Sequence, residues 1–238
     1  MRGNTATMAS QSHRILLTRP ADQGARFADA LRERFGLRIE ITESPLIAPR
    51  FLSPTLPDGP FDAVIFTSET AVQAAQSLTG LPRIAFTVGD RSATAARNAG
   101  FAAHSANGDA AALVGLLTQA RPGRVLHLHG QHTRGDVVGH LCRAGLQAEG
   151  VVVYTQEPRP LTPLAQHWLD DARPVIVPLF SPRTATLFPP RRTITAPLWL
   201  VALSPAVDHA ATFAAARRVT AARPDAPAML DAVATLIG

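Results

Sequence analysis

Few residues of this chain could perform acid–base chemistry, and the single tyrosine, Tyr154, is the most informative of them. It follows three consecutive valines, Val151–Val153, which favour a buried strand, and Pro158 cannot join a central ladder beyond it. Tyr154 is therefore expected near a strand end. A phenol at that place is either a packed aromatic whose hydroxyl finds a partner or a proton donor that faces a cleft.

The cationic residues restrict the chemistry further. All 23 of them are arginine, which excludes a Schiff base, a pyridoxal-phosphate anchor and a phosphate-loop lysine. A guanidinium binds carboxylates through paired hydrogen bonds, so a chain with a net charge of +5 suits a polycarboxylate ligand or a nucleic acid. The arginines are spread along the chain, which argues against nucleic-acid binding.

Length and composition indicate a soluble globular protein with one large domain or two small ones, since 46% of the 238 residues are hydrophobic and 17% are charged. Cys142 is the only cysteine, which excludes intrachain disulfides and fits a reducing cytoplasm. Residues 1–13 lack the apolar core of a signal peptide and are predicted to be a disordered leader. No run approaches the roughly 18 apolar residues of a membrane span.

Hydrophobic periodicity predicts strands and helices in alternation. The chain opens with a strand at 14–18, a helix bearing Phe27, Leu31 and Phe35, and a second strand at 37–42. Residues 44–60 contain five prolines, and we interpret them as a connection and a domain boundary. Beyond it we predict strands at 63–66, 84–88, 101–104, 124–128 and 148–154, and helices at 68–80, 92–98, 109–120 and 136–144.

After a connection at 158–163 the alternation restarts. We predict strands at 175–180, 198–203 and 219–221, and helices at 164–171, after Pro182, at 206–217 and at 228–237. Strands separated by helices imply parallel sheets covered on both faces. We therefore predict an α/β fold of two doubly wound parallel-sheet domains. One comprises residues 14–43 and 157–238, the other comprises residues 47–152, and two connections run side by side between them.

In open α/β sheets, ligands gather at the carboxyl ends of the strands, beside helix N-termini. The segments predicted there are 18–19, 67–70, 89–92, 130–134, 181–183 and 204–205, and hydroxyls, glycines and arginines dominate them. Such groups form a surface for carboxylates and not for metals or hydrides. Alternatively, Ser68, Ser92 and Ser204 are only helix caps.

Other constellations are weaker. His127, His129 and His132 could offer metal ligands from a strand edge, but catalytic zinc sites usually add a carboxylate or a well-spaced third ligand. Alternating histidines on a strand are more often partly buried polar contacts. No GxGxxG, GxSxG or GKS/T string occurs, so nucleotide binding and hydrolase chemistry have no direct support.

Taken together, the predicted strand ends resemble the uroporphyrinogen-III synthase family. Residues 15–20 are similar to the family's opening strand and turn, residues 65–72 to its FTS…AV motif and residues 88–93 to its VGxxTA motif. Gly130, Arg134, Leu141 and Gly145 follow its GxxxR…L…G spacing. Residues 152–154 are similar to its VY and residues 180–182 to its FSP. The resemblance covers nearly the whole chain after residue 13.

The resemblance implies two α/β domains bridged by a two-stranded linker, with the active site in the cleft. The implied reaction closes hydroxymethylbilane to uroporphyrinogen III, with loss of water and inversion of ring D through a spiro intermediate. No cofactor and no metal is implied. The implied partner is the linear tetrapyrrole, which carries eight carboxylates; nucleic acid and membrane are not expected, and the enzyme is expected to be a cytoplasmic monomer.

The resemblance also suggests roles for individual residues. Tyr154 would assist departure of the hydroxyl by hydrogen bonding to it or protonating it. Much of the remaining work would be positioning of the last ring. The candidates for holding acetates and propionates are Arg19, Ser68, Thr70, Ser92, Arg134, Ser181 and Arg183.

Two departures from the family pattern leave other hypotheses open. Where the family tends to read AIGxxTA, residues 203–207 are LSPAV and lack the glycine and the threonine, and Thr70 stands where Asn or Arg is common. An inactive homologue that kept the fold is therefore a second hypothesis. A third is a non-catalytic two-lobed protein that binds an acidic ligand.

Overall fold

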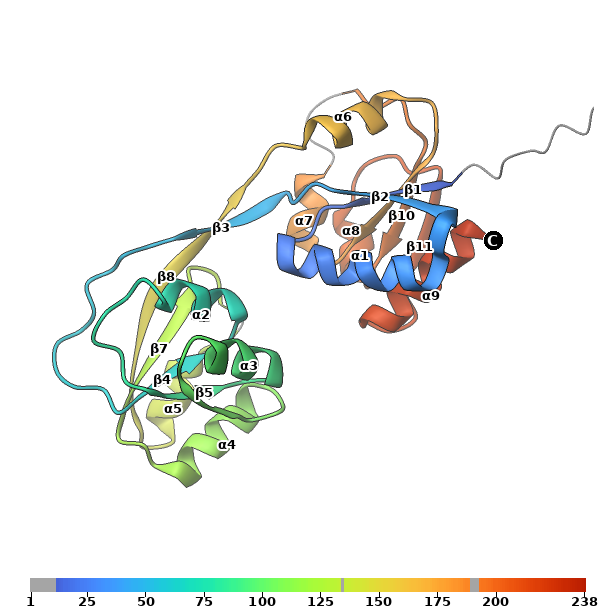
Figure 1. Cartoon of the computed structure of the whole chain (residues 1–238). Coiled ribbons are helices and arrows are strands. Elements are labelled where there is room, and N and C mark those ends of the chain that lie inside the picture. Colours follow the sequence, from blue (N-terminus) through green and yellow to red (C-terminus); the bar gives the residue numbers. More distant parts are fainter. Residues whose placement is uncertain (1–11, 134, 189–192) are drawn as a thin grey trace, which may run out of the picture. The chain divides into compact units, whose positions relative to one another are not determined.

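The computed structural model describes residues 12–133, 135–188 and 193–238. Within them the chain forms two compact units. One unit is discontinuous and is made of the described residues up to Ala48 together with those from Pro158 onward, and the other comprises Pro49–Glu157. Each unit contains its own sheet (Figure 1). No helix in this described part is both long and apolar enough to cross a membrane.

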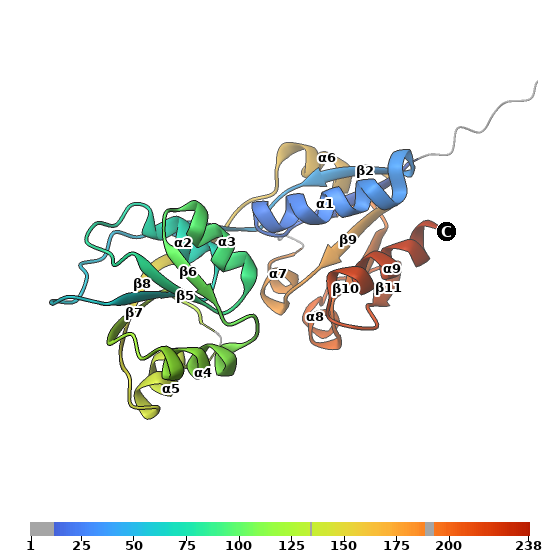
Figure 2. The same cartoon turned by 60° about the horizontal axis from the view of Figure 1, so that its bottom comes forward.

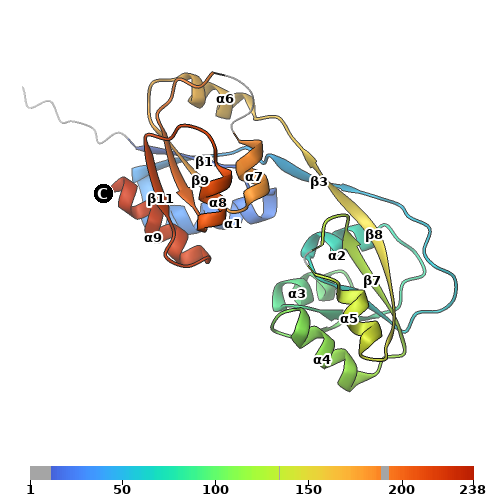
Figure 3. The same cartoon turned by 180° about the vertical axis from the view of Figure 1, so that it is seen from behind.

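The discontinuous unit is built on a five-stranded sheet of order β11-β10-β9-β1-β2, whose neighbouring strands are parallel. Its strands are β1 (His13–Leu17), β2 (Ile39–Glu43), β9 (Val175–Leu179), β10 (Leu198–Ala202) and β11 (Arg217–Thr220). Its helices are α1 (Ala21–Phe35), the 3-10 turn η1 (Gly36–Arg38), α6 (Pro163–Asp170), α7 (Pro182–Leu187), α8 (Pro205–Ala210) and α9 (Ala226–Ile237), and Figures 2 and 3 show them around the sheet.

Both faces of this sheet are covered. Ile15 and Leu17 of β1 pack in a cluster with α1 and α9, whereas Leu16 packs in a second cluster with α6, α7 and α8. Successive side chains of a strand point to opposite faces, so an apolar run such as Ile15–Leu17 feeds both cores. The sequence pattern therefore leads directly to a doubly wound sheet.

The second unit has a six-stranded sheet of order β3-β8-β7-β4-β5-β6. Its strands are β3 (Ile47–Phe51), β4 (Ala63–Phe66), β5 (Ile84–Thr87), β6 (Ala102–Ser105), β7 (Arg124–Gly130) and β8 (Gln147–Pro158). One apolar cluster packs α2 (Glu69–Ala75) and α3 (Asp90–Asn98) on the sheet, and another packs α4 (Ala110–Ala120) and α5 (Val137–Arg143) (Figure 1). The α/β class with parallel sheets is confirmed.

Two element predictions were wrong. Residues 206–217 do not form one helix, because α8 ends at Ala210 and Arg217 begins β11. The guanidinium of Arg218 bonds the Asp208 carboxylate and the carbonyls of Ala211 and Phe213, which holds a turn where the alanine-rich sequence favours a helix. The prolines of 44–60 also concealed β3, an edge strand, where proline is tolerated.

The predicted leader, residues 1–13, is only partly described. Residues 1–11 lie outside the described residues, and His13 is the first residue of β1. Ser12 and His13 therefore belong to the folded unit. Ser12 hydrogen-bonds through its hydroxyl to the Glu40 carboxylate, which ties the start of β1 to β2.

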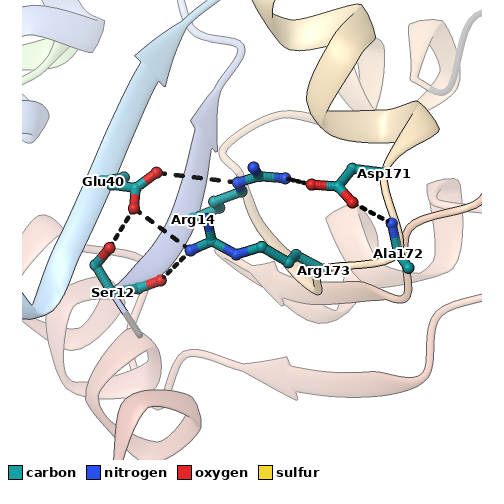
Figure 4. A network of polar contacts seen from close by, with 6 residues as sticks. All are labelled: Ser12, Arg14, Glu40, Asp171, Ala172 and Arg173. Carbon is teal, nitrogen blue, oxygen red and sulfur yellow. Dashed lines mark hydrogen bonds and ion pairs between the residues drawn. The ribbon is translucent and has the colours of Figure 1, made fainter. Parts of the chain in front are cut away.

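A polar network joins the amino-terminal ends of three neighbouring strands of the five-stranded sheet (Figure 4). Arg14 is 8% exposed, and its Nη1 lies 2.6 Å from Asp171 Oδ2, while its Nε lies 3.9 Å from Glu40 Oε2. Arg173 bonds the Ser12 carbonyl at 2.7 Å and Glu40 at 3.4 Å. The Ser12 hydroxyl, followed by the two arginines, lowers the pKa of Glu40, and the Arg14 hydrogen bond is the main cause of the lowered pKa of Asp171.

Glu40→Gln is expected to show what this network contributes. The folded-state pKa of Glu40 lies below its unfolded value, so its contribution is present above the unfolded pKa and is lost as the pH falls through the folded pKa. Because Glu40 is partly exposed, the loss at neutral pH should be only about 0.5–1 kcal/mol. Urea unfolding followed by tryptophan fluorescence from pH 7 to about pH 3 measures it.

The matched control for this prediction is Asp29→Asn, which breaks an exposed pair with Arg32 on α1. It should change the free energy of unfolding by no more than about 0.5 kcal/mol. A difference between Glu40→Gln and the wild type that stayed constant down to acid pH would contradict the assigned ion pairing.

Candidate active site

Tyr154 lies on β8 opposite Gly130, the last residue of β7. The register shifts just before this pair, because Val152 is opposite His129 and Tyr154 is opposite Gly130. The extra residue is Val153, as in a β-bulge, a feature that changes the direction of a side chain. Tyr154 was predicted near a strand end, but β8 continues to Pro158, and the strand that ends beside the phenol is β7.

The phenol ring is mostly buried, while its hydroxyl has a polar partner. Tyr154 is 8% exposed and packs in the apolar cluster of α2 and α3, and its Oη lies 3.2 Å from Ser68 Oγ. The first interpretation made from the sequence, a packed aromatic whose hydroxyl has a partner, is confirmed, and the role as a proton donor stays a prediction. The ring is a packed aromatic, and the hydroxyl is available at the end of β4 for hydrogen bonding.

Ser68 has two contacts through a single oxygen. It is the N-cap of α2, where Oγ accepts a hydrogen bond from the Ala71 N–H at 3.1 Å, and the same atom meets the Tyr154 hydroxyl. The helix-cap interpretation is thus correct for Ser68. It does not exclude a role in the site, because a hydroxyl oxygen accepts through two lone pairs and still has a proton to donate.

The other predicted serine caps differ. Ser92 is buried inside α3, whose N-cap is Gly89, so the cap interpretation is wrong for it. Ser204 occupies the N-cap position of α8 but makes no side-chain cap bond. Thr70 lies in the first turn of α2 and is half-buried. Ser92 and Thr70 each follow a strand of the same sheet that carries Tyr154.

The histidines of β7 form a buried polar contact. His127 is 3% exposed, its Nε2 lies 3.3 Å from Thr67 Oγ1, and its ring centroid lies 4.8 Å from that of His129. Burial, assisted by the neighbouring His129, lowers the pKa of His127 to about 3, so this imidazole is neutral near pH 7. Among the residues that the structure describes, no group of three His, Cys, Asp or Glu could hold a metal ion.

In the five-stranded sheet, Arg19 and Ser181 follow the neighbouring strands β1 and β9. The Arg19 guanidinium carbon lies 3.8 Å from the centroid of the Phe180 ring, and Nη2 donates to Gln23 at 3.0 Å. Phe180 in turn meets Phe27 edge-on, with centroids 4.9 Å apart. A guanidinium over an aromatic face is attracted by the ring quadrupole, so Phe180 orients Arg19.

Ser181 is the N-cap of α7 and accepts from the Thr184 N–H at 3.1 Å. Arg183, in the first turn of α7, is half-buried. Arg134 lies outside the described residues, so its predicted role has no structural counterpart here.

The structure adds three contacts that the sequence did not predict. Phe180 orients Arg19, Thr67 contacts the buried His127, and Gly130 lies beneath the phenol ring. All three residues occur in the matched family strings, but no signal in the sequence showed which side chain each would meet. Those contacts join residues of different strands and depend on register.

Comparison with known proteins agrees with this architecture. The family model described as "Uroporphyrinogen-III synthase HemD" matches residues 25–231, and no curated protein matches. A crystal structure of uroporphyrinogen-III synthetase from Helicobacter pylori 26695 is 17% identical, with a TM-score of 0.66 over 94% of this chain and 99% of the other. A mutant uroporphyrinogen III synthase from the extremely thermophilic bacterium Thermus thermophilus is 16% identical, with a TM-score of 0.47 over 94% and 98%.

At these identities the solved structures support the fold alone, whereas the family model covers most of the chain. Its match includes Tyr154 and the segments after strand ends that carry Ser68, Ser92 and Ser181. The chain therefore belongs to the uroporphyrinogen-III synthase family.

Proposed function

We propose that this chain catalyses the ring closure of hydroxymethylbilane to uroporphyrinogen III, with loss of water and inversion of ring D. The observation that carries this proposal is the chain's only phenol, whose hydroxyl is hydrogen-bonded to Ser68 at the end of β4. Family membership supplies the reaction, and this hydroxyl pair supplies a group suited to its first step.

The first chemical step needs a proton at the leaving hydroxyl. In our proposal Tyr154 hydrogen-bonds to that hydroxyl or protonates it, so that it departs as water. Ring closure later releases a proton from a pyrrole carbon, which restores the phenol, and the net change is loss of one water. The protons therefore balance without a cofactor, and the proposal includes no cofactor.

The remaining work in this proposal is binding and orientation. Acetate and propionate groups would be held by Arg19 and Arg183, with hydroxyls and N–H groups from the capped helix starts adding neutral donors. The candidates are Arg19, Ser68, Thr70, Ser92, Arg134, Ser181 and Arg183. The inversion depends on the pose of the last ring, so restricting its orientation is itself catalytic.

We also propose that the protein acts as a monomer in the cytoplasm, with no nucleic-acid or membrane partner. Its exposed thiol, Cys142, fits a reducing compartment. The large exposed apolar residues among those described are Leu37, Phe51, Ile84 and Leu164, and each comes from a different element. Scattered apolar residues do not form the contiguous patch that a stable interface requires.

Incubation of the purified protein with hydroxymethylbilane and separation of the product isomers tests the proposed reaction. A functional enzyme gives isomer III. A non-catalytic binding protein and an inactive homologue both leave spontaneous closure to isomer I. The changed turn at 203–207, where Ser204 makes no side-chain cap bond, is what keeps the inactive homologue among the outcomes.

Tyr154→Phe should lower turnover to isomer III by about 10²-fold or more, since only the hydroxyl is lost. Folding should be little affected, with the free energy of unfolding reduced by about 1 kcal/mol or less. Isomer-resolved chromatography gives the rate and urea unfolding gives the stability. Thr118→Val, which removes a hydroxyl that donates to the Val114 carbonyl within α4, is the control. Turnover by Tyr154→Phe at the wild-type rate would remove the phenol from the mechanism.

Arg19→Lys should raise KM by about tenfold with a smaller effect on kcat, because an ammonium can neither bind a carboxylate through two bonds nor stack flat on Phe180. Steady-state kinetics with hydroxymethylbilane measures the change. Arg32→Lys, on the exposed pair of α1, should leave both constants unchanged. Equal KM values for Arg19→Lys and Arg32→Lys would show that Arg19 does not bind the substrate.

A further inference from the structure

No side chain fits at position 130, and the backbone conformation of Gly130 is not the reason. Its φ is not among the positive values of the described glycines, so a residue with a side chain could adopt this conformation. A Cβ added at Gly130, however, would lie 2.5 Å from Cζ, 2.7 Å from Cε2 and 2.8 Å from Oη of Tyr154. The constraint at this position is therefore the phenol itself.

The Tyr154 ring has little freedom to move away from an added methyl group. The backbone of Tyr154 is fixed at the bulge, where its carbonyl accepts from the Gln131 N–H at 2.9 Å. Its ring packs with buried residues of α2 and α3, as in other close-packed interiors. An alanine at 130 would displace the hydroxyl end of the ring, because Cζ and Oη are two of the three atoms that meet the Cβ.

Displacement matters because the hydroxyl has one defined partner. Tyr154 Oη lies 3.2 Å from Ser68 Oγ, and a shift of even half an ångström can break a hydrogen bond of that length. Ser68 is itself held, since its Oγ accepts from the Ala71 N–H at the start of α2. Two contacts thus set the position of Oη: the close approach of the ring to Gly130 and the hydrogen bond with Ser68.

Either hydroxyl could donate in the Ser68–Tyr154 contact, and the capping bond at Ser68 is compatible with Ser68 as the donor. Ser68 Oγ already accepts from Ala71, and its own proton is available to donate to Tyr154 Oη. With Ser68 as donor, the phenol keeps its proton for the leaving hydroxyl of the substrate. With Tyr154 as donor, that proton would be occupied within the protein.

We propose that Gly130 and Ser68 are positioning residues for Tyr154. Gly130 leaves the space that the phenol ring occupies, because any side chain at position 130 would overlap the ring. Ser68 donates a hydrogen bond to Oη, so that the phenol proton remains available for the substrate. This inference rests on the proposed catalytic role of Tyr154. It assigns Ser68 to the phenol, where the sequence suggested a carboxylate contact.

A spectroscopic test does not require activity. Tyr154 is the only tyrosine, so protein grown with [ζ-13C]tyrosine gives one tyrosine resonance that reports on this phenol alone. Gly130→Ala and Ser68→Ala should each shift it, whereas Ser68→Thr should keep it near the wild-type position. Gly115→Ala, in α4 with nothing within 4 Å of the added Cβ, and Asp109→Ala, which removes the cap of α4, should leave it unmoved.

Kinetics then separates positioning from general damage. Gly130→Ala should lower kcat at least about tenfold in the wild-type background, because misplacing the acid is costly. In the Tyr154→Phe background the same substitution should change kcat less than about twofold, since no hydroxyl remains to misplace. The destabilisation by urea unfolding should be similar in both backgrounds, because Cζ of either ring meets the methyl group.

Each outcome of these experiments decides something. An unshifted resonance in Gly130→Ala, or an equal loss of kcat in both backgrounds, overturns the proposal for Gly130. Ser68→Thr behaving as Ser68→Ala does overturns the hydrogen-bonding role of Ser68. If the wild type makes no isomer III, the proposed function fails. The tyrosine resonance alone then still decides whether Gly130 and Ser68 position the phenol.

Discussion

Each of the two sheets is buried on both of its faces, and the rest of the structure depends on this burial. All of β4, and β1 from Ile15 to Leu17, are apolar because successive side chains enter different cores. Polar side chains are costly at such positions unless they are hydrogen-bonded, so they collect at the strand ends. The carboxyl ends carry Arg19, Ser68 and Ser181, and the amino-terminal end of β1 carries the Arg14 network.

Tyr154 illustrates how a polar group is accommodated in such a core. Its ring belongs to an apolar cluster, and its hydroxyl reaches the start of α2, where Ser68 is also the helix cap. One serine oxygen thus stabilises a helix terminus and binds the phenol. Secondary structure and the candidate chemistry are coupled through that atom, so a change at Ser68 affects both.

The side chains at these strand ends agree with the proposal of an anionic substrate. On β7, the strand paired with the one that carries Tyr154, burial keeps His127 neutral and its ring faces Thr67, while His129 Nδ1 lies 2.9 Å from the Gly130 carbonyl oxygen. Arginine supplies every side-chain cation other than histidine, and Arg19 is oriented by stacking on Phe180. Planar guanidinium groups with hydroxyls at helix starts form a surface suited to carboxylates.

The sequence by itself determined the α/β class, the order of most strands and helices, and the chain segments at the carboxyl ends of the strands. Apolar runs bounded by glycine and proline specify such elements locally, which is why β7, α4 and α9 lie close to their predicted positions. The alanine-rich stretch after α8 misled the prediction, because Arg218, from β11, holds that turn.

Only the tertiary structure decided which of these residues meet. The bulge that places Tyr154 opposite Gly130, the contact between its hydroxyl and Ser68, and the stacking of Arg19 on Phe180 each join different strands. Strand register and packing set those contacts, and a shift of one residue would send each side chain to the other face. No local pattern in the sequence specifies register between strands that are far apart along the chain.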